Sequence, residues 1–168
     1  MQSGKISAKS TAGAGTTFSF FIPYKKSSER GNNNEQVDAP ASLLNGASIL
    51  AVDDNELSLL FLKTMTAKWN VRFFQASNGE DALGILAKNK ITIVLTDIQM
   101  PGMDGNDLLT AIQKLDGPAG KVPVVVIGGA SNAVGNKKLL KKGFTGVISK
   151  PFKEAELLEQ LLIALNSK

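Results

Sequence analysis

The sequence predicts an α/β fold: a doubly wound, five-stranded parallel sheet with helices on both faces, preceded by a small β-hairpin. Between residues 47 and 168, short apolar segments alternate with longer segments whose apolar residues recur at helical spacing. The short segments are apolar almost throughout, which is typical of strands buried on both faces of a parallel sheet. Right-handed crossovers and the length of this region favour the strand order 2-1-3-4-5, counted along it.

The strands are predicted where β-branched and aliphatic residues cluster between turn-forming residues. They are expected at residues 48–52, 71–76, 91–96, 122–127 and 146–149.

Helices are expected after each of these strands. Asn78 is a good N-cap for the second helix. In the first helix, Leu59, Leu60 and Leu62 are expected to face inward together with Met65. The helices are expected at residues 56–69, 79–88, 105–114, 132–142 and 153–165.

Residues 1–24 are expected to form a β-hairpin, with strands around 5–10 and 16–22. Two strands alone are marginally stable, so we interpret the hairpin as the edge of a larger sheet. Residues 25–46 are polar and are predicted to be a flexible linker to the α/β domain at 47–168. Disorder, packing onto that domain and a dimer formed through the hairpin edges are alternatives left open for the hairpin.

The composition excludes several classes of function. The chain of 168 residues has no cysteine and no histidine. Disulfides and thiolate metal sites are therefore excluded, and histidine chemistry must come from another molecule or from sequence outside this chain. The net charge is +4, but aromatic residues are only 6% and no basic run is interleaved with them, so no nucleic acid partner is expected. Without a long apolar run or a secretory leader, we expect a cytoplasmic fragment with no membrane contact.

Acidic residues stand at the ends of the first and third predicted strands. Asp53 and Asp54 follow the first strand and Asp97 follows the third, and these ends are neighbours at the topological switch point of the predicted sheet. Three converging carboxylates need a cation, and oxygen ligands without His or Cys favour Mg²⁺. Lys150 closes the fifth strand at the same edge. We therefore interpret Asp97 as a phosphate acceptor, with Mg²⁺ and Lys150 offsetting the phosphoryl charge, and Asp104 as a helix cap rather than a metal ligand.

Three segments carry the most specific signal in this region. They are Val52-Asp53-Asp54-Asn55, Thr96-Asp97-Ile98-Gln99-Met100-Pro101-Gly102-Met103-Asp104-Gly105 and Lys150-Pro151-Phe152. Together they resemble the response regulator receiver domain family, over residues 47 to about 167. The resemblance implies a flavodoxin-like fold in which Asp97 is phosphorylated and Lys150 contacts the phosphoryl group. It also implies that Asp54, Asp97 and the backbone carbonyl of Gln99 bind Mg²⁺ directly, and that Asp53 acts largely through water.

The N-terminal hairpin carries a second, looser resemblance. Its segments are Met1-Gln2-Ser3-Gly4-Lys5-Ile6 and Gly13-Ala14-Gly15-Thr16-Thr17-Phe18-Ser19-Phe20, followed by Pro23. They resemble the closing hairpin of a histidine kinase ATPase domain. Both resemblances together imply the C-terminal end of a hybrid sensor histidine kinase of a two-component system. A phosphohistidine-bearing kinase or phosphotransfer domain would be the partner in a phosphorelay. The ATP site, the donor histidine and any membrane anchor would lie outside this fragment, which would catalyse only its own phosphorylation.

Two positions depart from the pattern of that family. The family places Ser or Thr at the end of the fourth strand, where this chain has Gly128, and Ser131 would substitute only if the loop bends back. The family also prefers an aromatic residue three positions before the lysine, where this chain has Val147. We therefore expect Asp97 to accept phosphate but to signal weakly through the fourth helix.

Two other functions stay open at this point. A phosphatase-type hydrolase would also use an aspartate nucleophile, but it needs a second acid two residues later, where this chain has Gln99. A degenerate receiver would be a protein-binding or regulatory module without efficient phosphorylation. The departures at Gly128 and Val147 permit the second alternative, whereas the intact acids and Lys150 disfavour it.

Overall fold

The computed structural model describes residues 5–11, 15–21, 41–128 and 133–167. The chain divides into two compact units, Met1–Glu35 and Gln36–Lys168, and each is described by itself. In the first unit, β1 (Lys5–Thr11) pairs antiparallel with β2 (Gly15–Phe21). The predicted hairpin is therefore confirmed.

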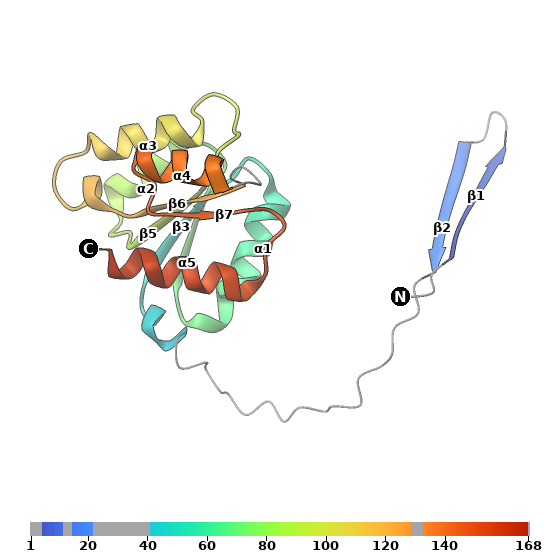
Figure 1. Cartoon of the computed structure of the whole chain (residues 1–168), viewed down its shortest axis with the longest axis horizontal. Coiled ribbons are helices and arrows are strands. Elements are labelled where there is room, and N and C mark those ends of the chain that lie inside the picture. Colours follow the sequence, from blue (N-terminus) through green and yellow to red (C-terminus); the bar gives the residue numbers. More distant parts are fainter. Residues whose placement is uncertain (1–4, 12–14, 22–40, 129–132, 168) are drawn as a thin grey trace. The chain divides into compact units, whose positions relative to one another are not determined.

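The second unit is built on a parallel sheet in the order β4-β3-β5-β6-β7 (Figure 1). Counted along this unit, the order is 2-1-3-4-5, as predicted from the sequence. Each strand lies within one or two residues of its predicted position. The bounds are β3 Ser48–Val52, β4 Arg72–Ala76, β5 Ile93–Asp97, β6 Val124–Ile127 and β7 Gly146–Ile148.

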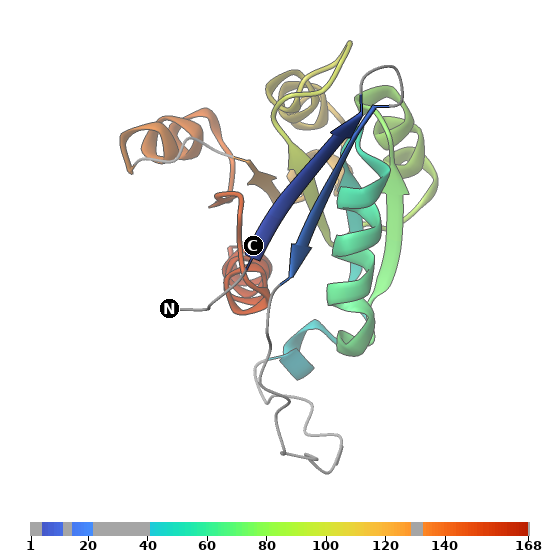
Figure 2. The ribbon, with the colours of Figure 1, turned by 90° about the vertical axis from the view of Figure 1, so that its right-hand side faces the viewer.

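Helices cover both faces of this sheet, as Figures 1 and 2 show from two directions. The buried residues of α1 and α5 pack in one hydrophobic cluster, and those of α2, α3 and α4 pack in the other. The bounds are α1 Glu56–Thr66, α2 Gly79–Lys88, α3 Gly105–Gln113, α4 Ala133–Lys142 and α5 Glu154–Asn166, with short 3₁₀ turns η1 Ala41–Leu44, η2 Ala67–Trp69 and η3 Ala119–Lys121. No helix in the described ranges is long and apolar enough to cross a membrane.

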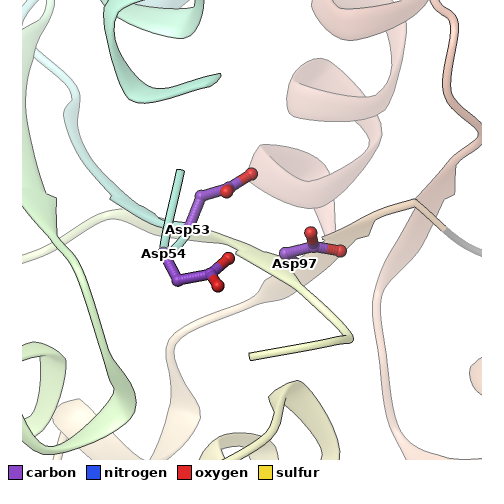
Figure 3. Close-up of side chains that lie close together, drawn as sticks. All are labelled: Asp53, Asp54 and Asp97. Carbon is purple, nitrogen blue, oxygen red and sulfur yellow. The ribbon is translucent and has the colours of Figure 1, made fainter. Parts of the chain in front are cut away.

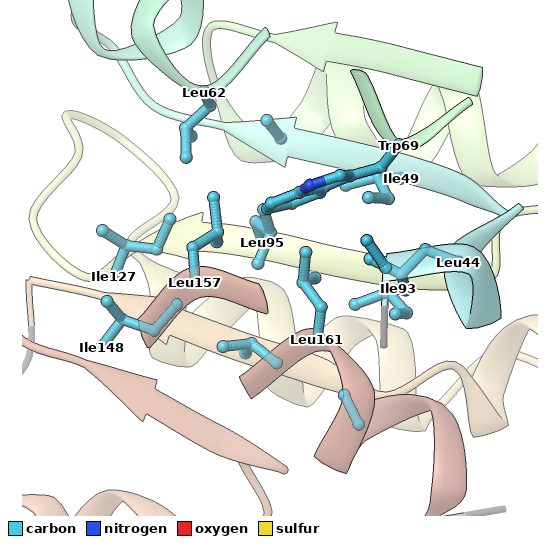
Figure 4. Close-up of a cluster of buried hydrophobic side chains, with 14 of the residues drawn as sticks. Leu44, Ile49, Leu62, Trp69, Ile93, Leu95, Ile127, Ile148, Leu157 and Leu161 are labelled. Carbon is cyan, nitrogen blue, oxygen red and sulfur yellow. The ribbon is translucent and has the colours of Figure 1, made fainter. Parts of the chain in front are cut away.

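The central strands contribute alternate residues to the two clusters. Ile93 and Leu95 of β5 pack toward α1 and α5, where Figure 4 shows them beside Leu157 and Leu161. Val94, which lies between them, packs toward α2 and α3. Full burial of each such side chain contributes about 1.5–3 kcal/mol, so both faces hold the sheet rigidly. This rigid sheet fixes the positions of the residues that follow its strands.

Two differences from the sequence expectations concern packing. The turn η1 falls inside residues 25–46, the range predicted to be a linker. Its Leu44 is fully buried against Trp69 and α5, so the folded unit begins before residue 47. Leu60 was expected to face inward but is 59% exposed. The buried face of α1 runs along Leu59 and Leu62, and Leu60 lies about 100° away from Leu59 around the helix.

Candidate functional site

The carboxyl ends of β3 and β5 lie side by side. The register pairs Val52 of β3 with Thr96 of β5, so the next residue of each strand path, Asp53 and Asp97, reaches the same edge of the sheet. This edge is where ligands bind in open α/β sheets. Figure 3 shows Asp53, Asp54 and Asp97 close together there.

The three carboxylates form one cluster. One oxygen of each, from Asp53, Asp54 and Asp97, lies within 4.8 Å of the others. Asp53 is buried at 3% exposure, Asp97 is half-buried and Asp54 is exposed. The predicted convergence of these three residues is therefore observed.

Lys150 links two of these acids. Its Nζ donates to Oδ2 of Asp53 at 3.1 Å and to Oδ2 of Asp97 at 3.0 Å. Partial burial disfavours the charged form, but the hydrogen bonds and charges of Asp97 and Asp53 outweigh it and raise the pKa of Lys150 above its ordinary value. At neutral pH this group is therefore a cation and cannot serve as a base.

Backbone donors orient the two acids that face Lys150. Oδ1 of Asp53 accepts the amide N–H of Asn55 at 2.9 Å, and Oδ1 of Asp97 accepts that of Ile98 at 2.7 Å. Asn55 in turn caps α1, because its side chain accepts from the amides of Leu57 and Ser58. Each acid thus has one oxygen fixed by the backbone and one oxygen directed to Lys150.

The loop between β5 and α3 carries Gln99, two residues after Asp97. It is closed by the Gly105 amide, which donates to the carbonyl of Ile98 at 3.0 Å. Only glycine fits at 105, because a Cβ there would collide with the carbonyl oxygen of Asp97. Asp104 accepts from the amides of the first turn of α3, so its predicted role as a helix cap is confirmed. The side chain of Gln99 is exposed in this loop.

Gly128 follows β6 directly beside Asp97. Its φ is +92°, and a Cβ built on it would lie 2.8 Å from Oδ1 of Asp97. Ser131, considered above as a substitute, lies outside the described residues. Val147 of β7 is half-buried and packs against the cluster of α2, α3 and α4.

The donor set fits a hard divalent cation. Carboxylate and carbonyl oxygens are the ligands that Mg²⁺ prefers, and this ion usually keeps several waters. A span of up to 4.8 Å among the three carboxylate oxygens suits an ion held by some of them directly and by others through water. Asp53, Asp54, Asp97 and the carbonyl of Gln99 are the groups that would hold it.

An exposed apolar surface beside these acids was not predicted from the sequence. Leu57, Leu60 and Phe61 of α1 are 74%, 59% and 48% exposed. Phe61 packs edge to face on Phe152, with ring centroids 5.9 Å apart. The spacing of 57, 60 and 61 places these residues on one side of the helix. This spacing is the feature of the sequence from which the surface could have been predicted. We call Leu57, Leu60 and Phe61 the α1 apolar surface.

This surface reaches the site itself. A cavity of about 190 Å³ is lined both by Phe61 and Phe152 and by Asp53 and Lys150. A molecule that covers the α1 apolar surface would therefore lie next to the acids.

Known sensor kinases resemble this chain over part of their length. The sensor histidine kinase GacS of Pseudomonas protegens is 30% identical over 116 residues, which cover 68% of this chain and 13% of that protein. The sensor histidine kinase RcsC of Escherichia coli K12 is 36% identical over 105 residues, which cover 61% of this chain and 10% of that protein. The autoinducer 1 sensor kinase/phosphatase LuxN of Vibrio campbellii is 28% identical over 167 residues, which cover 88% of this chain and 19% of that protein. This chain thus spans a fifth or less of the length of these relatives.

Solved structures share the fold. The receiver domain of a sensor histidine kinase from Pseudomonas aeruginosa PAO1, crystallised with a magnesium ion coordinated in its active-site cleft, is 25% identical with a TM-score of 0.63. The match covers 73% of this chain and 99% of that one. The chemotaxis protein CheY4 of Vibrio cholerae, at 24% identity and a TM-score of 0.65, matches in fold over 71% of this chain and 99% of its own.

The family description of the response regulator receiver domain matches residues 49–162, which contain the sheet, the acids and Lys150. The chain therefore belongs to the response regulator receiver domain family.

Proposed function

We propose that this domain accepts a phosphoryl group from a phosphohistidine onto Asp97, with Mg²⁺, and passes it on in a phosphorelay. The observation that carries the proposal is the position of Lys150, whose ammonium group bridges Asp53 and Asp97 beside a cluster of three carboxylates. A fixed cation next to a nucleophilic carboxylate is what phosphoryl transfer needs, since charge builds up on the phosphoryl oxygens.

In the transfer, a carboxylate oxygen of Asp97 bonds to phosphorus while the bond from phosphorus to the donor imidazole nitrogen breaks. The electron pair of that bond stays on the imidazole. Lys150 stabilises the charge on the phosphoryl oxygens, and the amide of Ile98 holds the other oxygen of Asp97 in place. Bound Mg²⁺ supplies further neutralisation of the phosphoryl charge. Asp54, Asp97 and the Gln99 carbonyl would hold this ion directly, and Asp53 would hold it largely through water.

The donor must come from elsewhere, because this chain has no histidine. We assign the chain to the C-terminal part of a hybrid sensor histidine kinase that works at the cytoplasmic side. It would contain an ATPase hairpin at 1–24, a linker that starts at 25 and ends before η1, and a receiver domain that includes η1 together with residues 47–168. The alignment with LuxN supports this organisation. It covers 88% of the chain, whereas residues 47–168 make up less than three quarters of it, so the similarity includes residues before the receiver domain.

The α1 apolar surface is the place where we dock the phosphohistidine-bearing partner. The donor imidazole has to come within bonding distance of Asp97, so the partner must cover the edge of the sheet and the elements beside it. Leu57 and Leu60 are exposed there, and Phe61 lines the cavity that leads to Lys150. Contiguous exposed apolar side chains of this kind mark protein-binding sites.

The proposal is tested by incubating the chain with Mg²⁺ and a small phosphodonor, followed by intact mass spectrometry. A single phosphoryl adduct is expected, and Asp97→Asn should abolish it. Asp104→Asn is the matched control, because asparagine also caps helices and Asp104 lies outside the cluster. An adduct that persists in Asp97→Asn would contradict the assignment of Asp97.

The alternative function is a binding or regulatory module that is not efficiently phosphorylated. The absence of side-chain polar groups at Gly128 and Val147 is the observation that favours it. The same experiment separates the two functions, since this alternative predicts no adduct in the unmodified chain. Continuous release of phosphate from a phosphoester would instead support the hydrolase considered above.

A further inference from the structure

The backbone after β6 passes Asp97 at a distance that leaves no room for a side chain. A Cβ on Gly128 would stand 2.8 Å from Oδ1 of Asp97 and 3.8 Å from Cδ of Lys150. The first value is well inside the normal contact distance between carbon and oxygen. In addition, the φ of Gly128 is +92°, a backbone conformation that residues with a side chain rarely adopt. Both features select glycine at this position.

The backbone N–H of Gly128 is hydrogen-bonded to a group other than Asp97. It donates to the carbonyl of Ile148 on β7 at 2.8 Å, which continues the pairing of β6 with β7 past the last residue of β6. Gly128 therefore offers Asp97 neither a side chain nor a free N–H group. Among the described residues, the donors to the carboxylate of Asp97 are the amide of Ile98 and Nζ of Lys150.

The neighbouring strand contributes no polar side chain either. Val147 pairs with Val126 of β6, and its side chain packs in the hydrophobic cluster below α2, α3 and α4. This cluster also contains Leu139 of α4. Among the described residues, the side chains that β7 and α4 share in this cluster, Val147 and Leu139, are therefore apolar and offer a phosphoryl group no hydrogen bond.

A modification changes a distant surface only if it makes different contacts in two conformations of the protein. We propose, building on the phosphoacceptor function above, that Gly128 uncouples phosphorylation of Asp97 from the surface formed by α4 and β7. The domain then hands the phosphoryl group on, from Asp97 to a second imidazole, while the α4 surface stays as it is. Its four lysines, at 137, 138, 141 and 142, remain presented in both states.

Beryllofluoride with Mg²⁺, which mimics a phosphoryl group on aspartate, provides the test. Amide chemical shifts of the full chain are compared with and without it by NMR. Large changes are expected at Asp54, Ile98 and Gln99, with changes about tenfold smaller at the amides of Val147 and of 134–142. Comparable changes at both sets would overturn the uncoupling while leaving the phosphoacceptor function intact.

The same measurement distinguishes failure of the uncoupling from failure of the phosphoacceptor function. If no amide responds although the chain is folded, beryllofluoride does not bind Asp97, and the phosphoacceptor function falls together with the inference that rests on it. The unmodified chain is sufficient for this test, so it does not depend on a variant that must fold.

Discussion

Lys150 and Asp97 are held together across the edge of the sheet: Nζ of Lys150 lies 3.0 Å from Oδ2 of Asp97, although 53 residues separate them. The same Nζ reaches Asp53 at 3.1 Å. This lysine therefore occupies the space between two acids that we assign to metal binding and phosphoryl transfer, and it competes for their charge with any cation that binds there.

Replacing this lysine should have opposite effects on catalysis and on metal binding. In Lys150→Ala, the rate of phosphorylation by a small phosphodonor is expected to fall about 100-fold, because one stabilising group for the phosphoryl oxygens is lost. The affinity for Mg²⁺ should rise several-fold, because a competing cation is removed. Mass spectrometry and calorimetric titration measure the two effects, with Lys88→Ala, at the exposed end of α2, as the control. Weaker Mg²⁺ binding in Lys150→Ala would contradict this account.

Asp54 is the exposed member of the cluster and should matter for the metal rather than for the fold. Asp54→Asn is expected to weaken Mg²⁺ binding about tenfold or more, because one charged ligand is lost, and to leave the melting temperature unchanged. Calorimetric titration with MgCl₂ checks the affinity. Glu159→Gln, which removes an exposed charge from α5, should bind Mg²⁺ as the unmodified chain does.

The α1 apolar surface predicts a difference between protein and small-molecule donors. The double variant Leu57→Ala/Leu60→Ala should accept phosphate from a small phosphodonor at the normal rate. Transfer from a phosphohistidine-bearing protein should slow about tenfold or more, because two exposed anchors of the partner are lost. Ile163→Ala removes an apolar side chain that is 46% exposed on α5 and serves as the control. Equal loss with both donors would place the defect in the acid cluster instead of the surface.

Gly128 predicts a steric effect that can be separated from backbone strain. Alanine at a positive φ costs about 1 kcal/mol wherever it occurs. Gly128→Ala should in addition displace Asp97 and slow its phosphorylation about tenfold or more, because small misplacements of reacting groups are costly. Gly117→Ala is the matched control, since Gly117 has a φ of +72° and nothing within 4 Å of the added Cβ. Equal phosphorylation rates in the two variants would refute the steric argument.

The neighbours Leu43 and Leu44 test where the folded domain begins. Leu44 is fully buried and Leu43 is 62% exposed. Leu44→Ala should lower the free energy of unfolding by about 2–4 kcal/mol, and Leu43→Ala should change it by less than about 0.5 kcal/mol. Urea denaturation followed by the fluorescence of Trp69, which packs in the same cluster as Leu44, measures both. Equal effects would mean that η1 is not part of the cooperative unit.

Much of the candidate site was predictable because it follows from strand order. Asp53 and Asp97 end neighbouring parallel strands, so any chain with this order brings them to one edge. The strands themselves were predictable because apolar residues run along them without interruption. Asp104 was recognisable as a cap because capping is a local interaction between a side chain and the next turn.

The sequence by itself determined the order of strands and helices, the meeting of Asp53, Asp54 and Asp97, and the chemical type of the site. These depend on local patterns and on chain topology. Tertiary structure decided that Leu44 is buried, that Leu60 is exposed, that Lys150 bridges two acids, and that Gly128 stands beside Asp97 with a positive φ. Each of these depends on distances between residues far apart in the chain, which are set only when the helices pack on the sheet.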